Sequence, residues 1–440
     1  MKNVLFVVYE FPPLNSGGSH RPYRFLKFLG QYGINPVVVT PEVEESTSDR
    51  RLLEALDKNI KIIRTPLERS GKLDSLLSKN YVNILGTEAK RWKKHLFPVL
   101  EKLTTETAFD AMYVTAPPFS IADLGVEASK KFGIPLVLDM RDHWSHWNIT
   151  PFTSYLHYRL ILRKEGSWFK HAVAVLAVTE QMVEDFETVH ADVDKQKFHT
   201  VRNSYPSEIR DLRETVAVRK ATKEKPLKIG YVGSFYYHPY QRKLIFDKWW
   251  QKKPHQWLQY TPRQEDWLYR SPYFFFQALK TMLELYPELA SLVRVEFIGA
   301  KPEWLVAMID ESGLRDIVAL KGFLPHSESI AFQEGCDALL GTSMKVVGGK
   351  DYCIAGKSYE YIALQKPVLA FMTEGAQKTF FEASGMSVIL DADDIEHNAE
   401  KLRKFILGEV VLHPQKKFME QINSKHTTDK LASIIKKVAK

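Results

Sequence analysis

The sequence predicts an α/β protein made of two doubly wound domains with parallel sheets. Short continuous runs of β-branched and aromatic residues, such as residues 4–9 and 36–40, are typical of strands buried on both faces. An amphipathic segment that ends near a glycine, residues 22–30, lies between these two runs. The same alternation recurs on both sides of a charged stretch, which indicates two series of βαβ units.

The runs are assigned to elements in chain order. In the first half we expect strands at residues 4–9, 36–40, 110–115, 135–139, 171–179 and 198–201, and helices at 22–30 and 119–132. In the second half we expect strands at 227–232, 293–298, 316–320, 338–341, 367–371 and 387–390, and helices at 274–286 and 327–335. The predicted organisation is a first domain (1–209), a linker (210–225), a second domain (226–412) and a C-terminal helical segment (413–440) that packs back on the first domain.

Residues 236–269 interrupt this alternation. Four tryptophans, Trp249, Trp250, Trp257 and Trp267, occur within nineteen residues among lysines, tyrosines and glutamines. The stretch stands where a strand should lead directly into a helix, so we predict an insertion. It would form a self-packed lid or a surface for a glycan or a membrane.

The net charge favours an anionic ligand and does not indicate a nucleic-acid partner. Among 440 residues, 61 Lys and Arg oppose 53 Asp and Glu, which gives a formal net charge of +8. This mild excess suits an anionic small molecule or an anionic membrane surface. The basic stretch 70–103 would form an amphipathic helix that rests on lipid or only faces solvent.

We expect a cytoplasmic protein, with peripheral contact to the inner face of the cell membrane as an open alternative. The apolar run at residues 4–8 is too short for a secretory signal and lacks a small-residue cleavage site. No stretch reaches the roughly 18 apolar residues that a membrane span needs. Two cysteines, Cys336 and Cys353, can build neither a disulfide framework nor a four-cysteine zinc site.

Glycine and charged residues follow the strands predicted for the first half, at the edge where open parallel sheets bind ligands. Gly17 and Gly18 precede a helix, where bare backbone N–H groups could cradle an anion or the glycines could serve only a tight turn. Arg141, Asp142 and His143 follow the fourth predicted strand. Charges near a cleft cost desolvation, so this cluster favours sugar binding, although an Asp–Arg pair that pins the loop would also explain it.

The second half carries a comparable set of residues. Ser234 follows a glycine at the end of the first predicted strand of this half and would face the same cleft. Lys357 and Glu360 are three residues apart on a predicted helix, so they share one face. They would serve a ligand or form a surface ion pair of little energetic weight.

Four segments, taken in this order, resemble one known family. They are the Phe-Pro-Pro…Gly-Gly loop at 11–21, Thr-Ala-Pro-Pro-Phe-Ser at 115–120, Leu-Asp-Met-Arg-Asp-His-Trp at 138–144, and the segment 356–370, which begins Gly-Lys-Ser-Tyr-Glu-Tyr. They resemble the retaining GT-B-fold glycosyltransferases that use nucleotide-diphosphate sugars, over nearly the whole chain. The resemblance implies two Rossmann-like domains that face each other across a cleft, the first holding the acceptor and the second the nucleotide sugar.

The resemblance also implies the reaction. It is the transfer of a sugar, with retention, to a saccharide or lipid-linked acceptor, as in bacterial polysaccharide biosynthesis. The nucleotide sugar is a substrate, and neither a metal nor another cofactor is implied. The residues expected to bind the donor are Gly17, Gly18, Ser234, Arg270, Lys357 and Glu360.

Two positions depart from the family pattern or leave it open. Glu360 matches the second glutamate of the family's Glu-x7-Glu motif and would bind the ribose hydroxyls. The first glutamate is missing, because Tyr352 stands there with Asp351 beside it. The family's phosphate-binding arginine is Arg270 if residues 236–269 are an insertion, and Arg242 if they are not.

The expected catalytic cluster is Arg141, Asp142 and His143. Breaking a sugar–phosphate bond develops charge on the leaving diphosphate, which arginine, lysine and helix N-termini stabilise. No pair of carboxylates like that of retaining glycosidases is evident, nor an Asp-x-Asp pair for a metal. We therefore favour departure and attack on the same face, with Asp142 or His143 assisting the acceptor hydroxyl.

Two other function classes remain open because one fold hosts several activities. One is a sugar-nucleotide epimerase of the same fold. The other is a non-catalytic protein that binds nucleotide sugars or glycans, which the missing first glutamate favours. Donor hydrolysis or transfer would distinguish the enzyme from the binding protein.

Overall fold

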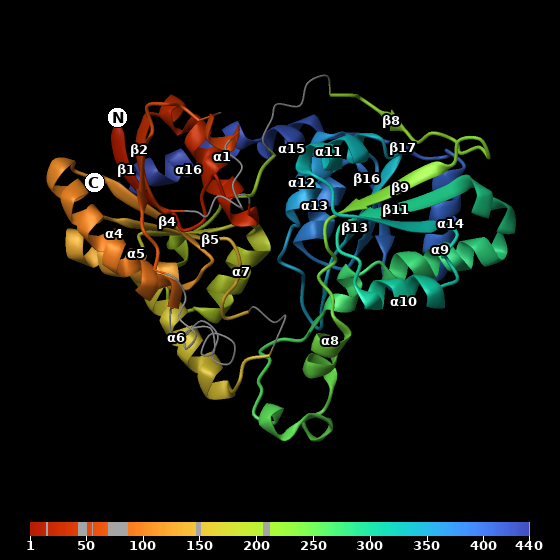
Figure 1. The fold of residues 1–440 in the computed structure, drawn as a ribbon, viewed down its shortest axis with the longest axis horizontal. Helices are drawn as coiled ribbons and strands as arrows, with labels where there is room; N and C mark the ends of the chain where they lie inside the picture. Colours follow the sequence, from red (N-terminus) through yellow and green to blue (C-terminus); the bar gives the residue numbers. More distant parts are fainter. Residues whose placement is uncertain are drawn as a thin grey trace.

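The structure is a computed structural model of the 440-residue chain. It describes residues 1–14, 16–42, 51–54, 56–68, 87–146, 151–205 and 212–439. Two α/β halves lie side by side, with the N-terminus and the C-terminus both on the first half (Figure 1).

The first half is built on a seven-stranded parallel sheet with the order β3-β2-β1-β4-β5-β6-β7. Its strands are β1 (Lys2–Val7), β2 (Ile34–Pro41), β3 (Lys61–Thr65), β4 (Ala111–Ala116), β5 (Leu136–Met140), β6 (Ala174–Ala177) and β7 (Phe198–Thr200). Its helices are α1 (Gly17–Leu29), α2 (Arg51–Glu54), α4 (Thr87–Glu106), α5 (Ser120–Phe132), α6 (Tyr155–His171) and α7 (Glu180–Val189). Strands β4, β5 and β6 are buried along their whole length, as their continuous apolar runs predict.

The second half repeats this topology in a six-stranded sheet with the order β12-β11-β9-β13-β15-β16. Its strands are β9 (Leu227–Val232), β11 (Val293–Ile298), β12 (Val318–Gly322), β13 (Ala338–Thr342), β15 (Val368–Met372) and β16 (Ser387–Asp391). Its helices are α8 (Pro239–Phe246), α9 (Tyr273–Leu285), α10 (Glu303–Glu311), α11 (His326–Glu334), α12 (Gly356–Ala363), α13 (Ala376–Ser384) and α14 (Ile395–Ile406). In each sheet the first strand lies in the middle, the next strands extend to one edge, and the later strands extend from the middle to the other edge. This is the doubly wound order predicted from the sequence.

The C-terminal segment forms α15 (Lys416–Gln421) and α16 (Ser424–Val438). Helix α16 packs on α1, and its Leu431 and Ile435 are completely buried in one cluster with Phe25 and Leu29. The prediction that the chain end returns to the first domain is therefore confirmed.

Short strands and one edge strand add detail that the sequence does not predict. Strand β3 is half-exposed at the sheet edge and has a mixed Lys-Ile-Ile-Arg-Thr sequence, so it carries no continuous apolar signal. Within the expected linker, β8 (Val216–Ala217) pairs with β17 (Val411–Leu412). Within the inserted stretch, β10 (Glu265–Asp266) pairs with β14 (Lys345–Val346). Part of the basic stretch 70–103 lies outside the described residues, and the rest belongs to α4, whose buried face includes Trp92, Leu96 and Leu100.

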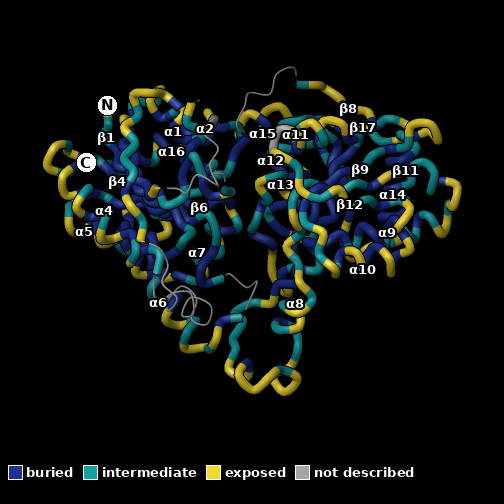
Figure 2. The backbone as a smooth tube through the Cα atoms, in the orientation of Figure 1, coloured by how far each residue is buried: buried dark blue, intermediate teal, exposed yellow. Residues whose placement is uncertain are grey.

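The stretch 236–269 extends away from the second sheet as a separate lobe at the lower edge of Figure 1, with α8 at its base. Figure 2 shows this lobe mostly exposed, in contrast to the buried sheets. Trp267 is buried, whereas Trp249, Trp250 and Trp257 are exposed. A self-packed lid would bury its tryptophans, and only one of the four is buried.

Candidate active site

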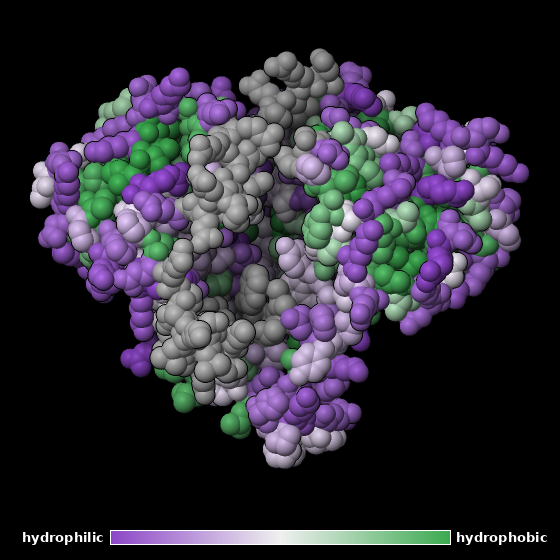
Figure 3. Space-filling view, viewed as in Figure 1, coloured by the Kyte–Doolittle hydropathy of each residue, from purple (hydrophilic) through white to green (hydrophobic). Residues whose placement is uncertain are grey.

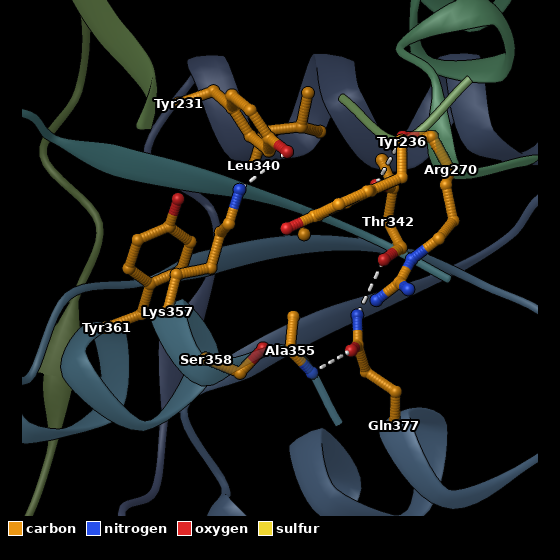
Figure 4. A pocket seen from close by; sticks show the side chains of 11 residues that line it. Tyr231, Tyr236, Arg270, Leu340, Thr342, Ala355, Lys357, Ser358, Tyr361 and Gln377 are labelled. Carbon is orange, nitrogen blue, oxygen red and sulfur yellow. Dashed lines mark hydrogen bonds between the residues drawn. The ribbon is translucent and has the colours of Figure 1, made fainter. Parts of the chain in front are cut away.

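A pocket lies at the carboxyl edge of the second sheet, where the strand order reverses between β9 and β13. Ligands of open parallel sheets bind at this switch point. The lining side chains come from β9, β13, the starts of α12 and α13, and the segment before α9: Tyr231, Tyr236, Arg270, Leu340, Thr342, Lys357, Ser358, Tyr361 and Gln377 (Figure 4). The position is where a nucleotide would be expected in this fold.

Two cations meet in this pocket, and neither forms an ion pair with a carboxylate of the described residues, although Asp351 acts on the charge of Arg270 and Glu360 on that of Lys357. The Lys357 ammonium donates to the Tyr231 hydroxyl at 2.6 Å and lies 3.8 Å from the centre of that ring. The Arg270 guanidinium, which is 8% exposed, lies 5.8 Å from the Tyr236 ring and contacts only the Cys353 sulfur at hydrogen-bonding range, 3.8 Å. Buried unpaired cations are costly, so their placement favours an anionic ligand.

The electrostatics of Lys357 point to the same requirement. Burial and, to a lesser extent, the positive charge of Arg270 lower the pKa of Lys357 to about 7, while Glu360 opposes the shift. An anion bound beside the ammonium would favour its charged form. The N-terminal end of α12, which carries Lys357, adds the positive end of a helix dipole.

Two glycines allow the chain to pass this close to the lysine. Gly233 and Gly299 end β9 and β11 with φ angles of +102° and +142°, which L-residues with a side chain rarely adopt. A Cβ on Gly233 would lie 3.1 Å from the Lys357 Nζ, and a Cβ on Gly299 would lie 2.3 Å from the Gly233 carbonyl oxygen. Ser234, expected to bind the donor, is exposed, and its carbonyl accepts from the Tyr231 hydroxyl at 3.2 Å.

The structure separates the two candidate arginines. Arg242 donates twice to the Asp266 carboxylate, at 2.8 Å from both Nε and Nη2. Its charge is therefore compensated within the inserted lobe. Arg270 lines the pocket with Lys357, and its backbone carbonyl is held there by the Thr342 hydroxyl at 3.0 Å.

Glu360 is half-buried on α12, three residues after Lys357, but it is not among the side chains that line this pocket. The ribose contact implied by the resemblance is therefore untested and stays a prediction.

The position of the missing first glutamate has a structural explanation. Tyr352 crosses to the first half, where its ring lies 4.3 Å from His143 and its carbonyl accepts from the Thr179 hydroxyl at 2.7 Å. Asp351 is fully buried and accepts from the Cys353 N–H at 2.8 Å through one oxygen, while the other has no partner among the described residues. Burial raises the pKa of Asp351 to about 6, against the effect of Arg270. The residue at the motif position thus joins the two halves.

In the first half, the second glycine of the pair, Gly18, lies against an ion pair between Glu10 and Arg141. Helix α1 begins at Gly17 with Ser16 as its cap, and Gly17 has open space around its Cα. A Cβ on Gly18 would lie 1.6 Å from a carboxylate oxygen of Glu10 and 2.0 Å from Nη1 of Arg141. Arg141 in turn donates to Glu10 at 2.9 Å and to the Pro117 carbonyl. Arg141 is therefore paired with a glutamate and not with an aspartate of its own loop, while Asp139 pairs with Arg21 at 2.8 Å.

Asp142 follows Arg141 and is half-buried, and its carboxylate has no hydrogen bond or ion pair with a described residue. Burial raises the pKa of Asp142, against the charges of Arg141, His143 and Arg270. Arg270 belongs to the second half, so the charges of the two halves act on each other across the cleft. The carboxylate of Asp142 is thus not engaged by a described residue, although Asp142 is not among the side chains that line the cation pocket.

His143 occupies a different environment from Asp142. Its side chain is 0% exposed, its Nε2 is 3.0 Å from the Asp185 carboxylate, and its Nδ1 has no partner among the described residues. Burial lowers the pKa of His143, so the neutral ring donates from Nε2 to Asp185. Asp185 also accepts from Arg263 at 3.0 Å. In this conformation His143 joins the two halves and has no surface open to an acceptor.

The sequence reasoning did not identify Tyr231, Tyr236 and Gln377 as pocket residues. Gln377 donates to the Thr342 carbonyl at 2.6 Å and accepts from the Ala355 N–H at 2.8 Å, so it ties β13 to the start of α12 (Figure 4). A tyrosine inside a strand has the same signal as a core residue, and Gln377 has no motif around it. Within the described ranges, no group of three or more His, Cys, Asp or Glu side chains could hold a metal ion.

Comparisons with known proteins support the fold alone. No protein-family model matches the chain, and no curated protein matches it. Among solved structures, HepE from Anabaena in complex with UDP and glucose is 14% identical and matches with a TM-score of 0.56 over 99% of this chain and 100% of its own. The lipopolysaccharide outer core galactosyltransferase WaaB is 15% identical, with a TM-score of 0.57 over 99% of this chain and 100% of its own.

A third similar structure is the UDP-forming α,α-trehalose-phosphate synthase from Burkholderia vietnamiensis. It is 12% identical and matches with a TM-score of 0.58 over 99% of this chain and 100% of its own. Both halves and the C-terminal return of the chain are thus included in these matches. The chain has the two-domain GT-B fold, as predicted from its sequence.

Proposed function

We propose that the protein transfers a sugar from a nucleotide-diphosphate sugar to an acceptor. The observation that carries this proposal is the pocket with Arg270 and Lys357, two cations that form no ion pair with a carboxylate of the described residues. The carboxylate of Asp142 in the first half is likewise unpaired, and the charge of Arg270 acts on it. The cations fit a diphosphate, and the carboxylate fits a hydroxyl group that must lose a proton. Similar structures include a complex with UDP and glucose and a galactosyltransferase, which supports the same substrate class.

In this proposal each half has its own task. Arg270 and Lys357 bind the diphosphate and stabilise the charge that develops on it as the sugar–phosphate bond breaks. Glu360 binds the ribose. Asp142 accepts the proton of the acceptor hydroxyl, and Arg141, fixed by Glu10, keeps the loop in place. His143 positions this loop through Asp185 and Tyr352 instead of touching the acceptor.

The finer properties follow the sequence predictions. We propose retention with departure and attack on one face, no requirement for a metal ion, and a saccharide or lipid-linked acceptor. We also propose peripheral contact with an anionic membrane. No helix in the described part of the chain is long and apolar enough to cross a bilayer.

The experiment that tests donor binding is thermal unfolding with a panel of nucleoside diphosphates and nucleotide sugars. A ligand that binds only the folded protein raises the melting temperature by mass action. We expect one nucleoside diphosphate to raise it, and Glu360→Ala to reduce the shift. Glu311→Ala, an exposed glutamate on α10, is the matched control and should keep the full shift. The absence of a shift with every nucleotide would contradict donor binding and favour the binding-protein alternative.

Product analysis then distinguishes the enzyme classes. Incubation with the nucleotide sugar that binds should yield free nucleoside diphosphate together with a glycosylated acceptor, or a hydrolysed sugar where no acceptor is given. An epimerised nucleotide sugar in the absence of an acceptor would instead identify the isomerase.

A further inference from the structure

The two halves together form a surface with exposed aromatic and basic residues, none of which lines the cation pocket. On the inserted lobe, Trp249 and Trp250 are each 58% exposed and Leu258 is 77% exposed. On the first turns of α6, Leu156 is 69% exposed. We name these residues, together with the neighbouring Trp257, Tyr155, Leu160 and the basic side chains between them, the aromatic–basic surface.

The two parts of this surface are physically joined. Residues Phe152, just before α6, and Tyr260, at the end of the lobe, pair through two backbone hydrogen bonds of 2.9 and 3.0 Å. The Tyr260 ring lies 5.0 Å from that of Tyr155. In Figure 1 the lobe and the start of α6 lie at the same end of the molecule.

Contacts within the inserted lobe fix the positions of the exposed tryptophans. The Trp249 ring meets Trp250 and Trp257 at 5.9 and 5.7 Å, nearly perpendicular to both. The Trp257 indole N–H donates to the Lys252 carbonyl at 3.0 Å. Large apolar groups gathered on a surface mark an interaction site, and these are ordered by contacts among themselves.

The positive charge around the tryptophans favours an anionic partner. Residues 236–260 contain five Lys and Arg and one acid, Asp247, which is a net +4 in a chain with a net charge of +8. The Lys248 ammonium lies 5.0 Å from the Trp250 ring, and Arg159 and Arg163 on α6 are exposed. The lower tip of Figure 3 is accordingly hydrophilic with paler areas among the charged ones. A second copy of the chain would place like charges against each other, which disfavours self-association through this face.

We propose that the aromatic–basic surface docks on an anionic phospholipid bilayer. Indole rings favour the boundary between headgroups and acyl chains, and lysine stems lie along apolar groups while their ammonium ends reach phosphates. Helix α4, where the sequence suggested a membrane contact, is less suited, because its Lys93 and Lys94 pair with Glu127 and Glu68 at 2.5 and 3.2 Å. The docking does not rest on sugar transfer, since it needs no nucleotide.

Vesicle sedimentation of the full-length protein tests the proposal. We expect binding to vesicles of equal parts phosphatidylcholine and phosphatidylglycerol, weak binding to phosphatidylcholine alone, and a loss of binding as salt rises. Replacing Trp249, Trp250 and Trp257 with serine should lower the vesicle affinity by at least about tenfold. The pair Lys248→Glu and Lys253→Glu should lower it to a similar extent.

Matched controls separate this surface from general effects of charge or exposure. Phe323→Ser removes an exposed aromatic ring elsewhere on the second half, and Lys416→Glu with Lys417→Glu reverses two exposed charges on α15, near the opposite end of the molecule (Figure 1). Both controls should bind vesicles like the unmodified protein. Equal melting temperatures would show that every variant folds.

Three results would overturn the docking proposal. The first is that the unmodified protein fails to sediment with anionic vesicles, or that the tryptophan variant sediments equally well. The second is a concentration-dependent dimer that the tryptophan variant lacks, because a second copy would then cover the surface. The third is binding to immobilised oligosaccharide without binding to vesicles. Nucleotide binding by thermal shift is measured separately, so failure of docking and failure of sugar transfer are distinguishable.

Discussion

The two halves of the molecule present equivalent sheet edges to one cleft, yet they differ in how their arginines are compensated. Arg141, after β5 in the first half, donates to Glu10 and to a backbone carbonyl. Arg270, beside β13 in the second half, has a thiol and aromatic rings around it and shares its pocket with Lys357. The charge of Arg141 is therefore compensated within the first half, whereas Arg270 in the second half forms no ion pair with a described residue.

The carboxylates of the two halves do not follow the same division. In the first half Asp142 has no partner among the described residues while Glu10 pairs with Arg141. In the second half Asp266 is engaged by Arg242, while one oxygen of Asp351 has no partner among the described residues. In the proposed function, the second half binds the anionic diphosphate and Asp142 of the first half accepts the proton. If this division is correct, substitutions in the two halves must affect different steps.

The largest expected effect is on turnover. Asp142→Asn keeps the size of the side chain but removes a proton acceptor, so we expect kcat for sugar transfer to fall by about 10²- to 10⁴-fold. The dissociation constant of the nucleoside diphosphate should stay within about twofold, because Asp142 lies in the half without the cation pocket. Steady-state kinetics and calorimetry on the same preparation measure both values. Asp310→Asn, which alters an exposed pair with Arg315, is the control, and unchanged turnover in Asp142→Asn would refute this role.

The second effect is on donor binding. Arg270→Met removes the buried guanidinium and should weaken nucleoside diphosphate binding by about ten- to hundredfold, the usual value of a hydrogen bond to a charged group. Arg242→Met is the matched variant, because its arginine already pairs with Asp266 and should change the dissociation constant little. If Arg242→Met weakened binding more than Arg270→Met, Arg242 in the inserted lobe would be the phosphate-binding arginine.

The third effect is a pH dependence confined to the second half. Lys357 is charged below its lowered pKa of about 7 and loses its proton above it, while a bound diphosphate would hold the proton. The affinity for the nucleoside diphosphate should therefore fall as the pH rises from 7 to 8.5, by up to about tenfold per pH unit, with proton uptake on binding. Calorimetry in buffers of different ionisation enthalpy measures this uptake. Lys357→Met should abolish the dependence, and an equal dependence in that variant would place its origin elsewhere.

The fold was predictable to a greater extent than the site. Strands that are buried on both faces, such as β4 and β9, leave a local apolar signal, and their order follows from the βαβ alternation. The edge strand β3 leaves none, because half of its surface faces solvent. Within the site, Arg270 could be named only through the resemblance, whereas the helix spacing of Lys357 and Glu360 left a ligand site and a surface ion pair equally open.

Contacts between the halves explain most of what the sequence did not predict. The pairing of His143 with Asp185, and of Tyr352 with His143, joins residues that are far apart along the chain. Nothing near His143 distinguishes a buried ring from one that touches a substrate. Likewise, the sequence shows Tyr352 only as a residue that replaces the first glutamate of the Glu-x7-Glu motif. In the structure its ring is part of the contact between the halves. Spacing along one element cannot reveal such partners on another.

The smallest expected effect tests the compensation of Arg141 itself. In Gly18→Ala the new methyl group would collide with the ends of the Glu10 and Arg141 side chains, which can move, so we expect the free energy of unfolding to fall by only about 1 kcal/mol. Gly17→Ala is the matched control, because open space surrounds that position and the protein should lose no stability. Denaturant unfolding of both variants measures the difference. If Gly18→Ala and Gly17→Ala are equally stable, the Glu10–Arg141 pair does not depend on a glycine at position 18. The difference between the two arginines would then be supported only by the surroundings of Arg270 in the second half.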